Sequence, residues 1–204
     1  MTVAAITITY NRLALTKQTV ESFYFKTRID HHVFVDNGST DGTQEYLRTR
    51  FDHINLEKNL GITEAFRIAV DKLEGFDFIL KLDNDIETVT DDIINRMLDF
   101  YSKNGMNYVA SPVDLNLDPN YAPHSFGKGT LNGYRVSYVS HTGGAFQMIP
   151  MAICRKLMDD YSHFKLGDQA IGGFYKANKY SPIYLLDLEM KHIGLNQSSN
   201  NYIL

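Results

Sequence analysis

Residues 76–85 have the sequence Phe-Asp-Phe-Ile-Leu-Lys-Leu-Asp-Asn-Asp, an apolar run that ends in two carboxylates. The run is short and nearly continuous, which predicts a buried strand over 76–82. Asp83 and Asp85 follow that strand together, at the edge where open α/β sheets bind their ligands. Carboxylate oxygens suit Mg²⁺ or Mn²⁺. An acidic turn is the alternative interpretation, because Asp and Asn are common turn residues.

Strands and helices alternate on both sides of this run. Short apolar runs predict further strands over 3–9, 32–35, 54–56, 108–111, 136–139, 145–149 and 183–186. Apolar residues at three- and four-residue steps predict helices over 13–23, 41–50, 61–73, 91–103 and 151–160, and another after Asp168. Residues 114–134, rich in Gly, Pro and Asn, predict an irregular connection. Alternation of this kind is typical of βαβ units around a mostly parallel sheet.

The composition is that of a folded chain without a strong electrostatic field. It has 204 residues, 44% of them apolar, and a net charge of −4. This size fits one domain, and the negative net charge gives no reason to expect nucleic acid as a partner. No apolar stretch reaches the roughly 20 residues that span a bilayer, so we expect no membrane span. A single cysteine, Cys154, predicts a cytoplasmic protein without internal disulfides.

Two further polar segments follow predicted strands. Asp36 comes directly after the strand over 32–35, with Gly38 and Gly42 nearby, so that the backbone can approach a ligand there. A capping Asp in a strand-to-helix turn explains the same residues equally well. The segment from Asn59 to Arg67 could bring a guanidinium to a base or phosphate, although an arginine on an amphipathic helix is more often solvated.

Four segments together are far more specific than any one of them. They are residues 7–12 (Thr-Ile-Thr-Tyr-Asn-Arg), 35–43 (Val-Asp-Asn-Gly-Ser-Thr-Asp-Gly-Thr), 59–67 and 82–85. In order and spacing they resemble the inverting family-two glycosyltransferases of GT-A fold, and the match continues more loosely at 141–146, 167–168 and 191–194. The resemblance implies a Rossmann-like α/β fold with a central, mostly parallel sheet flanked by helices and a mixed C-terminal half. It also implies one domain over 1–204, with a nucleotide-binding half (1–90) and an acceptor-side half (91–204).

The resemblance assigns roles to individual residues. It implies that the nucleotide of the donor is held by Thr9, Tyr10, Asn11, Asp36, Gly61, Arg67, Asp83 and Asn84. Asp85 would coordinate Mn²⁺ or Mg²⁺, and His192 would complete the metal or pyrophosphate site. His141, Gly143 and Gly144 would form a loop beside the transferred sugar.

The catalytic base is the least specific of these assignments. The resemblance implies Asp168, which would take the proton from an acceptor hydroxyl. Gly167 stands where a Glu commonly precedes that base, so the motif is short, and Asp159, Asp160 and Asp187 remain alternatives.

The expected activity is transfer of a sugar from a nucleotide-diphosphate donor, in the first place a UDP-sugar, to a hydroxyl acceptor with inversion. A sugar-phosphate nucleotidyltransferase is the enzyme alternative, but it normally has a Gly-rich, basic loop after the first strand, whereas residues 10–13 hold no glycine. A catalytically silent nucleotide-sugar binding module is the other alternative. At 204 residues the chain is short for this fold, which leaves room for a partner or a second copy in binding a glycan acceptor.

Overall fold

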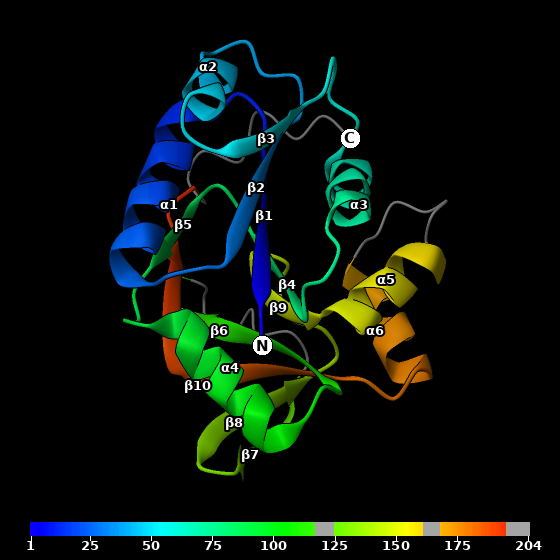
Figure 1. Ribbon diagram of the computed structural model, residues 1–204. Helices are drawn as coiled ribbons and strands as arrows, with labels where there is room; N and C mark the ends of the chain where they lie inside the picture. Colours follow the sequence, from blue (N-terminus) through cyan, green and yellow to red (C-terminus); the bar gives the residue numbers. More distant parts are fainter. Residues whose placement is uncertain (117–124, 161–167, 195–204) are drawn as a thin grey trace.

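The acidic triplet, Asp83-Asn84-Asp85, follows a strand near the centre of the sheet. That strand is β4 (Phe78–Leu82), and it belongs to a ten-stranded sheet in a computed structural model (Figure 1). The structure describes residues 1–116, 125–160 and 168–194. The strand order is β3-β2-β1-β4-β9-β6-β10-β8-β7, with β5 paired to β10 outside this path.

The N-terminal half of the sheet is parallel and the C-terminal half is mixed. Parallel pairs join β4 to β1 (Val3–Thr9), β1 to β2 (His31–Asp36), and β2 to β3 (Asp52–Asn55). Antiparallel pairs join β9 (Phe146–Pro150) to β4 and to β6 (Tyr108–Asp114). β10 (Ser181–His192) is parallel to β6 but antiparallel to β5 (Ile86–Thr88) and β8 (Tyr134–Val139), and β8 pairs with β7 (Ser125–Leu131). The predicted fold class is confirmed.

Helices cover both faces of the sheet because side chains alternate along each strand. Val3 and Ala5 of β1 face a core that also contains Phe23 of α1 (Leu13–Lys26) and Met97 of α4 (Ile93–Asn104). Their neighbours Ala4 and Ile6 face the opposite core, with residues of α3 (Ile62–Lys72), α5 (Met151–Asp160) and α6 (Asp168–Ala177). The short α2 (Thr43–Arg48) packs through Leu47 against Phe34 of β2. Figure 1 shows this layered arrangement.

The C-terminal half differs from the sequence prediction in three strands. β7 lies inside the stretch that was predicted to be irregular, and nearly all of it is exposed, so it has no periodic burial to detect. β5 is only three residues long and exists through its pairing with β10. β10 extends to His192 instead of ending near residue 186, and this extension carries His192 to the acidic triplet. None of the described helices is long and apolar enough to cross a membrane.

A buried imidazole links β2 to β1 and α1. His32 is 7% exposed, and its ring nitrogens hydrogen-bond to the Thr7 hydroxyl and the Tyr24 hydroxyl, both at 3.0 Å. The ring also stacks on Phe34. Burial, with a smaller contribution from neighbouring His31, lowers the pKa of His32 to about 3. The imidazole is therefore neutral in the folded protein.

We expect this imidazole to make the fold acid-sensitive. An unfolded histidine titrates near 6.5, so below that pH the unfolded chain binds a proton that the folded chain does not. The free energy of unfolding should then fall by up to about 1.4 kcal/mol per pH unit as the pH drops from about 6.5 toward 4. Urea midpoints for the parent and for His32→Gln, which does not titrate, would measure this. Equal pH dependence in the two proteins would contradict it.

Candidate active site

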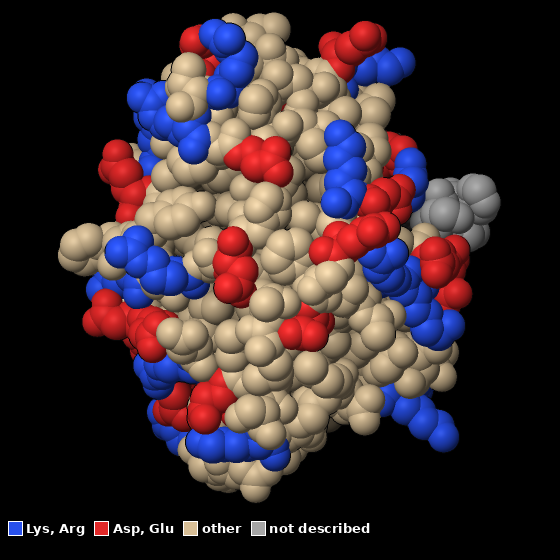
Figure 2. All heavy atoms as spheres, in the orientation of Figure 1, with Lys and Arg blue, Asp and Glu red and all other residues tan. Residues whose placement is uncertain are grey.

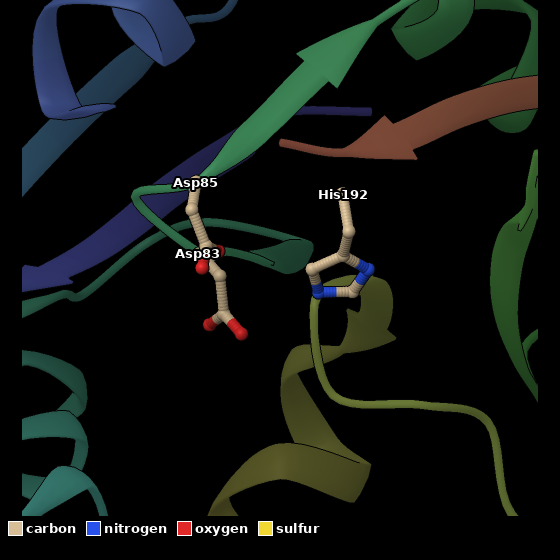
Figure 3. A group of neighbouring side chains, drawn as sticks. All are labelled: Asp83, Asp85 and His192. Carbon is tan, nitrogen blue, oxygen red and sulfur yellow. The ribbon is translucent and has the colours of Figure 1, made fainter. Parts of the chain in front are cut away.

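Two carboxylates and an imidazole meet at the carboxyl edge of β4. After the triplet the chain turns into β5, which pairs with β10 so that Ile86 lies opposite His192. The Ile193 N–H also donates to the Asp85 carbonyl at 2.9 Å. One ligand atom from each of Asp83, Asp85 and His192 lies within 4.8 Å of the other two (Figure 3). The structure thus brings these three residues together, and their roles stay predictions.

Asp114 fixes the imidazole of His192. Its carboxylate bonds to His192 Nδ1 through Oδ2 and accepts the His192 N–H through Oδ1 at 3.1 Å. The other ring nitrogen, Nε2, consequently lies on the side of the two aspartates, as Figure 3 shows. Burial alone would lower the pKa of His192, but the bond to Asp114 and the charges of Asp114, Asp85 and Asp83 outweigh burial and raise it. A carboxylate behind a histidine is a common way to orient a metal ligand.

Each aspartate of the triplet also has a basic partner. Arg12 Nη1 lies 2.7 Å from Asp85 Oδ2, and Lys81 Nζ contacts both Asp83 Oδ1 and the Gly144 carbonyl. Burial, then repulsion from Asp83, raises the pKa of Asp85, while His192 and Arg12 oppose that rise. The cluster is therefore electrostatically compensated within the protein.

Gly194 lies directly against Asp85. A Cβ added to Gly194 would be 2.8 Å from the Asp85 Cβ, closer than any real side chain tolerates. The close approach explains a glycine two residues after His192, and it confines the Asp85 carboxylate.

Asp36 is completely buried at the end of β2. Its Oδ1 accepts hydrogen bonds from the N–H groups of Gly38 (3.1 Å) and Ser39 (2.8 Å) and from Gln44 Nε2 (3.2 Å). Its Oδ2 is buried without a hydrogen-bond partner among the described residues. A buried carboxylate oxygen with no partner is costly, so this atom is a candidate acceptor for a hydrogen bond from a ligand.

Two of the predicted nucleotide residues bond to each other. The amide of Asn84 donates to Thr9 Oγ1 at 3.0 Å, and both side chains are buried. These contacts fix the triplet to the end of β1. Contact of Thr9 or Asn84 with a nucleotide stays a prediction.

The loop after β1 is held by the loop after β2. Asn11 has a φ of +51° and accepts the Thr40 N–H through Oδ1 at 2.7 Å, while its own N–H donates to Ser39 Oγ at 2.9 Å. Tyr10 beside it is 39% exposed and can contact a ligand.

The segment over 59–61 joins the Asp36 side of the site. Asn37 donates to Asn59 Oδ1 at 2.8 Å, and the Gly61 N–H donates to the same oxygen at 2.9 Å. Arg67 lies further along α3 and forms ion pairs of 2.6 Å with Glu64 and Asp71 of its own helix. The predicted role of Arg67 beside the base stays a prediction, and in the structure its guanidinium contacts these two carboxylates.

The loop over 140–145 adjoins the triplet and α6. The Gly143 N–H donates to the Tyr184 hydroxyl at 2.9 Å, Gly144 bonds to Lys81, and His141 Nδ1 lies 3.0 Å from Ser140 Oγ. Gly172 of α6 packs on this loop, because a Cβ there would lie 3.1 Å from the Ser140 carbonyl oxygen. Asp168 begins α6 one turn earlier; its side chain, like Gly167, lies outside the described part of the chain.

Sequence reasoning assigned no role to Arg12, Lys81 or Asp114. Lys81 had a detectable signal, since a charge inside a buried strand needs a partner. Asp114 would have been found by extending the strand over 108–111 to its true end, where it obeys the carboxyl-edge rule. Arg12 belongs to the segment over 7–12, but its partner Asp85 lies 73 residues away, so the sequence does not indicate the pair.

The donor set fits a divalent cation. Two carboxylate oxygens leave positions for water and phosphate oxygens, which is how Mg²⁺ and Mn²⁺ are usually held. The third donor of the group is an imidazole nitrogen.

The architecture and this site define the class as a GT-A type glycosyltransferase fold. A TarS fragment from S. aureus superimposes with a TM-score of 0.68 at 20% identity, over 93% of this chain and 59% of its own. GalNAc-T7 with UDP, GalNAc and Mn²⁺ gives 0.75 at 13% identity, over 94% and 44%. The Pyrobaculum calidifontis mannosyltransferase PcManGT, with GDP-Man and Mn²⁺, gives 0.73 at 15%, over 96% and 58%. The chain thus spans less than two thirds of each of these relatives.

The family follows from the sequence itself. The model of glycosyl transferase family 2 matches residues 4–169, and the chain belongs to that family. A comparison with curated proteins finds no match.

Proposed function

We propose that the chain transfers a sugar from UDP to a hydroxyl acceptor, with inversion and with Mn²⁺ as the preferred cation. The observation that carries this proposal is the cluster of Asp83, Asp85 and His192 at the sheet edge that also holds Asp36. Solved relatives of the same fold contain UDP or GDP-mannose together with Mn²⁺. The residues over 1–90 bind the nucleotide in this proposal, and those over 91–204 bind the acceptor.

The chain's own residues act on the leaving group and on the base. A divalent cation held by Asp85 and His192 supplies charge neutralisation for the diphosphate as the glycosidic bond breaks. Asp83 binds the ribose, and the unpartnered Asp36 Oδ2 accepts an N–H from the edge of the base. Uracil and guanine carry a ring N–H on that edge, whereas cytosine and adenine have a bare ring nitrogen there, beside an exocyclic amino group. Tyr10 and Arg67 complete the base site.

The acceptor side supplies the base and positions the sugar. Asp168 removes the proton of the acceptor hydroxyl, which attacks the anomeric carbon on the face opposite the leaving diphosphate. His141, Gly143 and Gly144 lie beside the transferred sugar, in a loop that Lys81 and Tyr184 hold. A glycan is the proposed acceptor. The cytoplasm is the proposed location, because the one cysteine, Cys154, is a buried free thiol.

Incubation with nucleotide sugars and Mn²⁺ tests the reaction. A transferase releases the nucleoside diphosphate, and release rises when an acceptor is added. A nucleotidyltransferase instead forms pyrophosphate from a sugar phosphate and a nucleoside triphosphate, and a silent binding module binds the donor without turnover. Either of these two results would overturn the proposal.

The base contact makes a separate prediction. In Asp36→Asn an amide faces the N–H of uracil, so UDP should bind roughly 10- to 100-fold more weakly, the effect of losing a hydrogen bond to a charged group. CDP should lose less, because its ring nitrogen can accept from the new amide. Calorimetry with UDP, GDP, CDP and ADP would measure both effects, with Asp52→Asn on the surface as the control. Equal binding of all four nucleotides by the parent would show that the base site is misassigned.

A further inference from the structure

Three ion pairs compensate the charges around the proposed cation site. They are Arg12–Asp85, Lys81–Asp83 and His192–Asp114. Lys81, His192 and Asp114 lie on strands, and the Lys81 ammonium also contacts the Gly144 carbonyl. Arg12 instead comes from the turn between β1 and α1. Among the basic residues of these three ion pairs, Arg12 is the one that lies in a loop.

Arg12 occupies the carboxylate that a cation would need. Its Nη1 lies 2.7 Å from Asp85 Oδ2, and both side chains are largely buried, at 18% and 11% exposure. Gly194 packs on the Asp85 side chain and restricts it. A guanidinium and a divalent cation at one carboxylate oxygen repel each other, and burial weakens the screening of that repulsion. A cation that binds Asp85 Oδ2 therefore competes with Arg12 for that oxygen.

We propose that Arg12 is a positioning residue that couples metal loading to nucleotide loading. Before loading, Arg12 neutralises Asp85. When the nucleoside diphosphate and the cation bind together, Arg12 would release Asp85 to the cation and bind the diphosphate instead. The inference rests on the proposed function, because the diphosphate is the ligand that takes over Arg12.

The energetic consequence is a mutual dependence of the two ligands. The cation alone would break a largely buried ion pair between Arg12 and Asp85, which is costly. A diphosphate removes that cost, since the planar guanidinium binds phosphate oxygens through two parallel hydrogen bonds. The nucleotide should thus raise the cation affinity, and the cation should raise the nucleotide affinity by the same factor. Part of this coupling comes from direct contact between cation and diphosphate, and Arg12 supplies the rest.

Electron paramagnetic resonance of free Mn²⁺ measures this coupling without any turnover. Titrations of the full chain with Mn²⁺ are done alone, with saturating UDP and with uridine. We expect the parent to bind Mn²⁺ weakly alone, and roughly 5- to 150-fold more tightly with UDP, the usual range of coupling between sites. Uridine lacks the diphosphate and should give no such gain.

Arg12→Gln isolates the contribution of the guanidinium. We expect this variant to bind Mn²⁺ alone about tenfold more tightly and UDP in EDTA about tenfold more weakly, so that the coupling factor falls. Arg12→Lys keeps the charge but not the planar group, so Mn²⁺ alone should stay weak while UDP binding drops; it also serves if Arg12→Gln fails to fold. Arg135→Gln removes the same charge from a more exposed Arg–Asp pair, with Asp187, and is the control for a change in net charge.

The outcomes separate this inference from the proposed function. If Mn²⁺ affinity and its gain with UDP are unchanged in both Arg12 variants, the inference is wrong while the proposed function stands. If the parent itself binds neither Mn²⁺ nor UDP, the proposed function fails, and the inference fails with it. A matching change in Arg135→Gln would reveal a nonspecific charge effect and would also overturn the inference.

Discussion

Asp85→Ala is expected to abolish sugar transfer. The Asp85 carboxylate lies against Arg12 and Gly194, and it groups with Asp83 and His192. Removing it takes away the carboxylate that holds the proposed cation together with His192, so the charge of the departing diphosphate is no longer neutralised. Loss of a comparable electrostatic contact to a transition state costs about 10²- to 10³-fold. Because the cation itself is also lost, the rate should fall by more than this factor.

The measurement combines turnover with metal binding. Release of UDP is followed in Mn²⁺ and in EDTA, and Mn²⁺ binding in the presence of UDP is measured separately. Asp85→Asn keeps the shape and a hydrogen bond for Arg12 but not the charge, so it should lose metal binding while its circular dichroism stays that of the parent. Asp91→Ala removes an exposed carboxylate that pairs with Lys26 and is the control. Full activity of Asp85→Asn, or of the parent in EDTA, would contradict the prediction.

The sequence predicted the parallel half of the fold because each of its signals is local. β4 (Phe78–Leu82) is buried and apolar except at Lys81, and the carboxyl-edge rule then places Asp36, Asp83 and Asp85 at one edge. Helical spacing likewise located α1 and α3 to within a few residues. These predictions needed no knowledge of distant contacts.

The remaining features depend on partners that are remote in sequence. β7 is an exposed edge strand with two glycines, and its existence depends on pairing with β8. Asp114 and His192 are 78 residues apart, so their bond follows only from the parallel pairing of β6 and β10. Arg67 is the opposite case. An arginine is suited to bind a base or phosphate, but in the structure Arg67 pairs with Glu64 and Asp71 of its own helix. Sequence patterns identify which residues can do chemistry, but tertiary pairing decides which of them meet.

The distribution of charged side chains on the surface fits the binding of a small ligand at a local site. On the face of the molecule drawn in Figure 2, basic and acidic side chains lie side by side around the rim. Separate acidic groups lie among uncharged ones nearer the middle of that face. With a net charge of −4, the chain has no broad positive field to attract a diphosphate over long distances. In the proposed function, the attraction at short range comes from the cation and from the basic side chains beside the acidic triplet, Arg12 and Lys81.

Asp168→Asn is expected to separate catalysis from donor binding. A general base contributes roughly 10²- to 10⁴-fold by accepting the acceptor proton in the transition state, whereas binding of the nucleotide needs no such group. Asn keeps the size and polarity of Asp168 but cannot take the proton. The variant should therefore lower kcat by about that factor and leave the dissociation constant for UDP nearly unchanged. The position supports this role, because α6 begins at Asp168 and its Gly172 packs on the loop beside the triplet.

Three other carboxylates test whether the base is correctly assigned. Asp187 pairs with Arg135, Asp160 pairs with Lys156, and Asp159 lies beside Asp160 at the end of α5. Steady-state rates and calorimetry of Asp159→Asn, Asp160→Asn and Asp187→Asn should match those of the parent. If one of them loses turnover while Asp168→Asn keeps it, the base is that residue and the alignment of 167–168 is wrong. If all four keep full turnover, none of these carboxylates is the base, and the inverting mechanism loses its proton acceptor on this part of the chain.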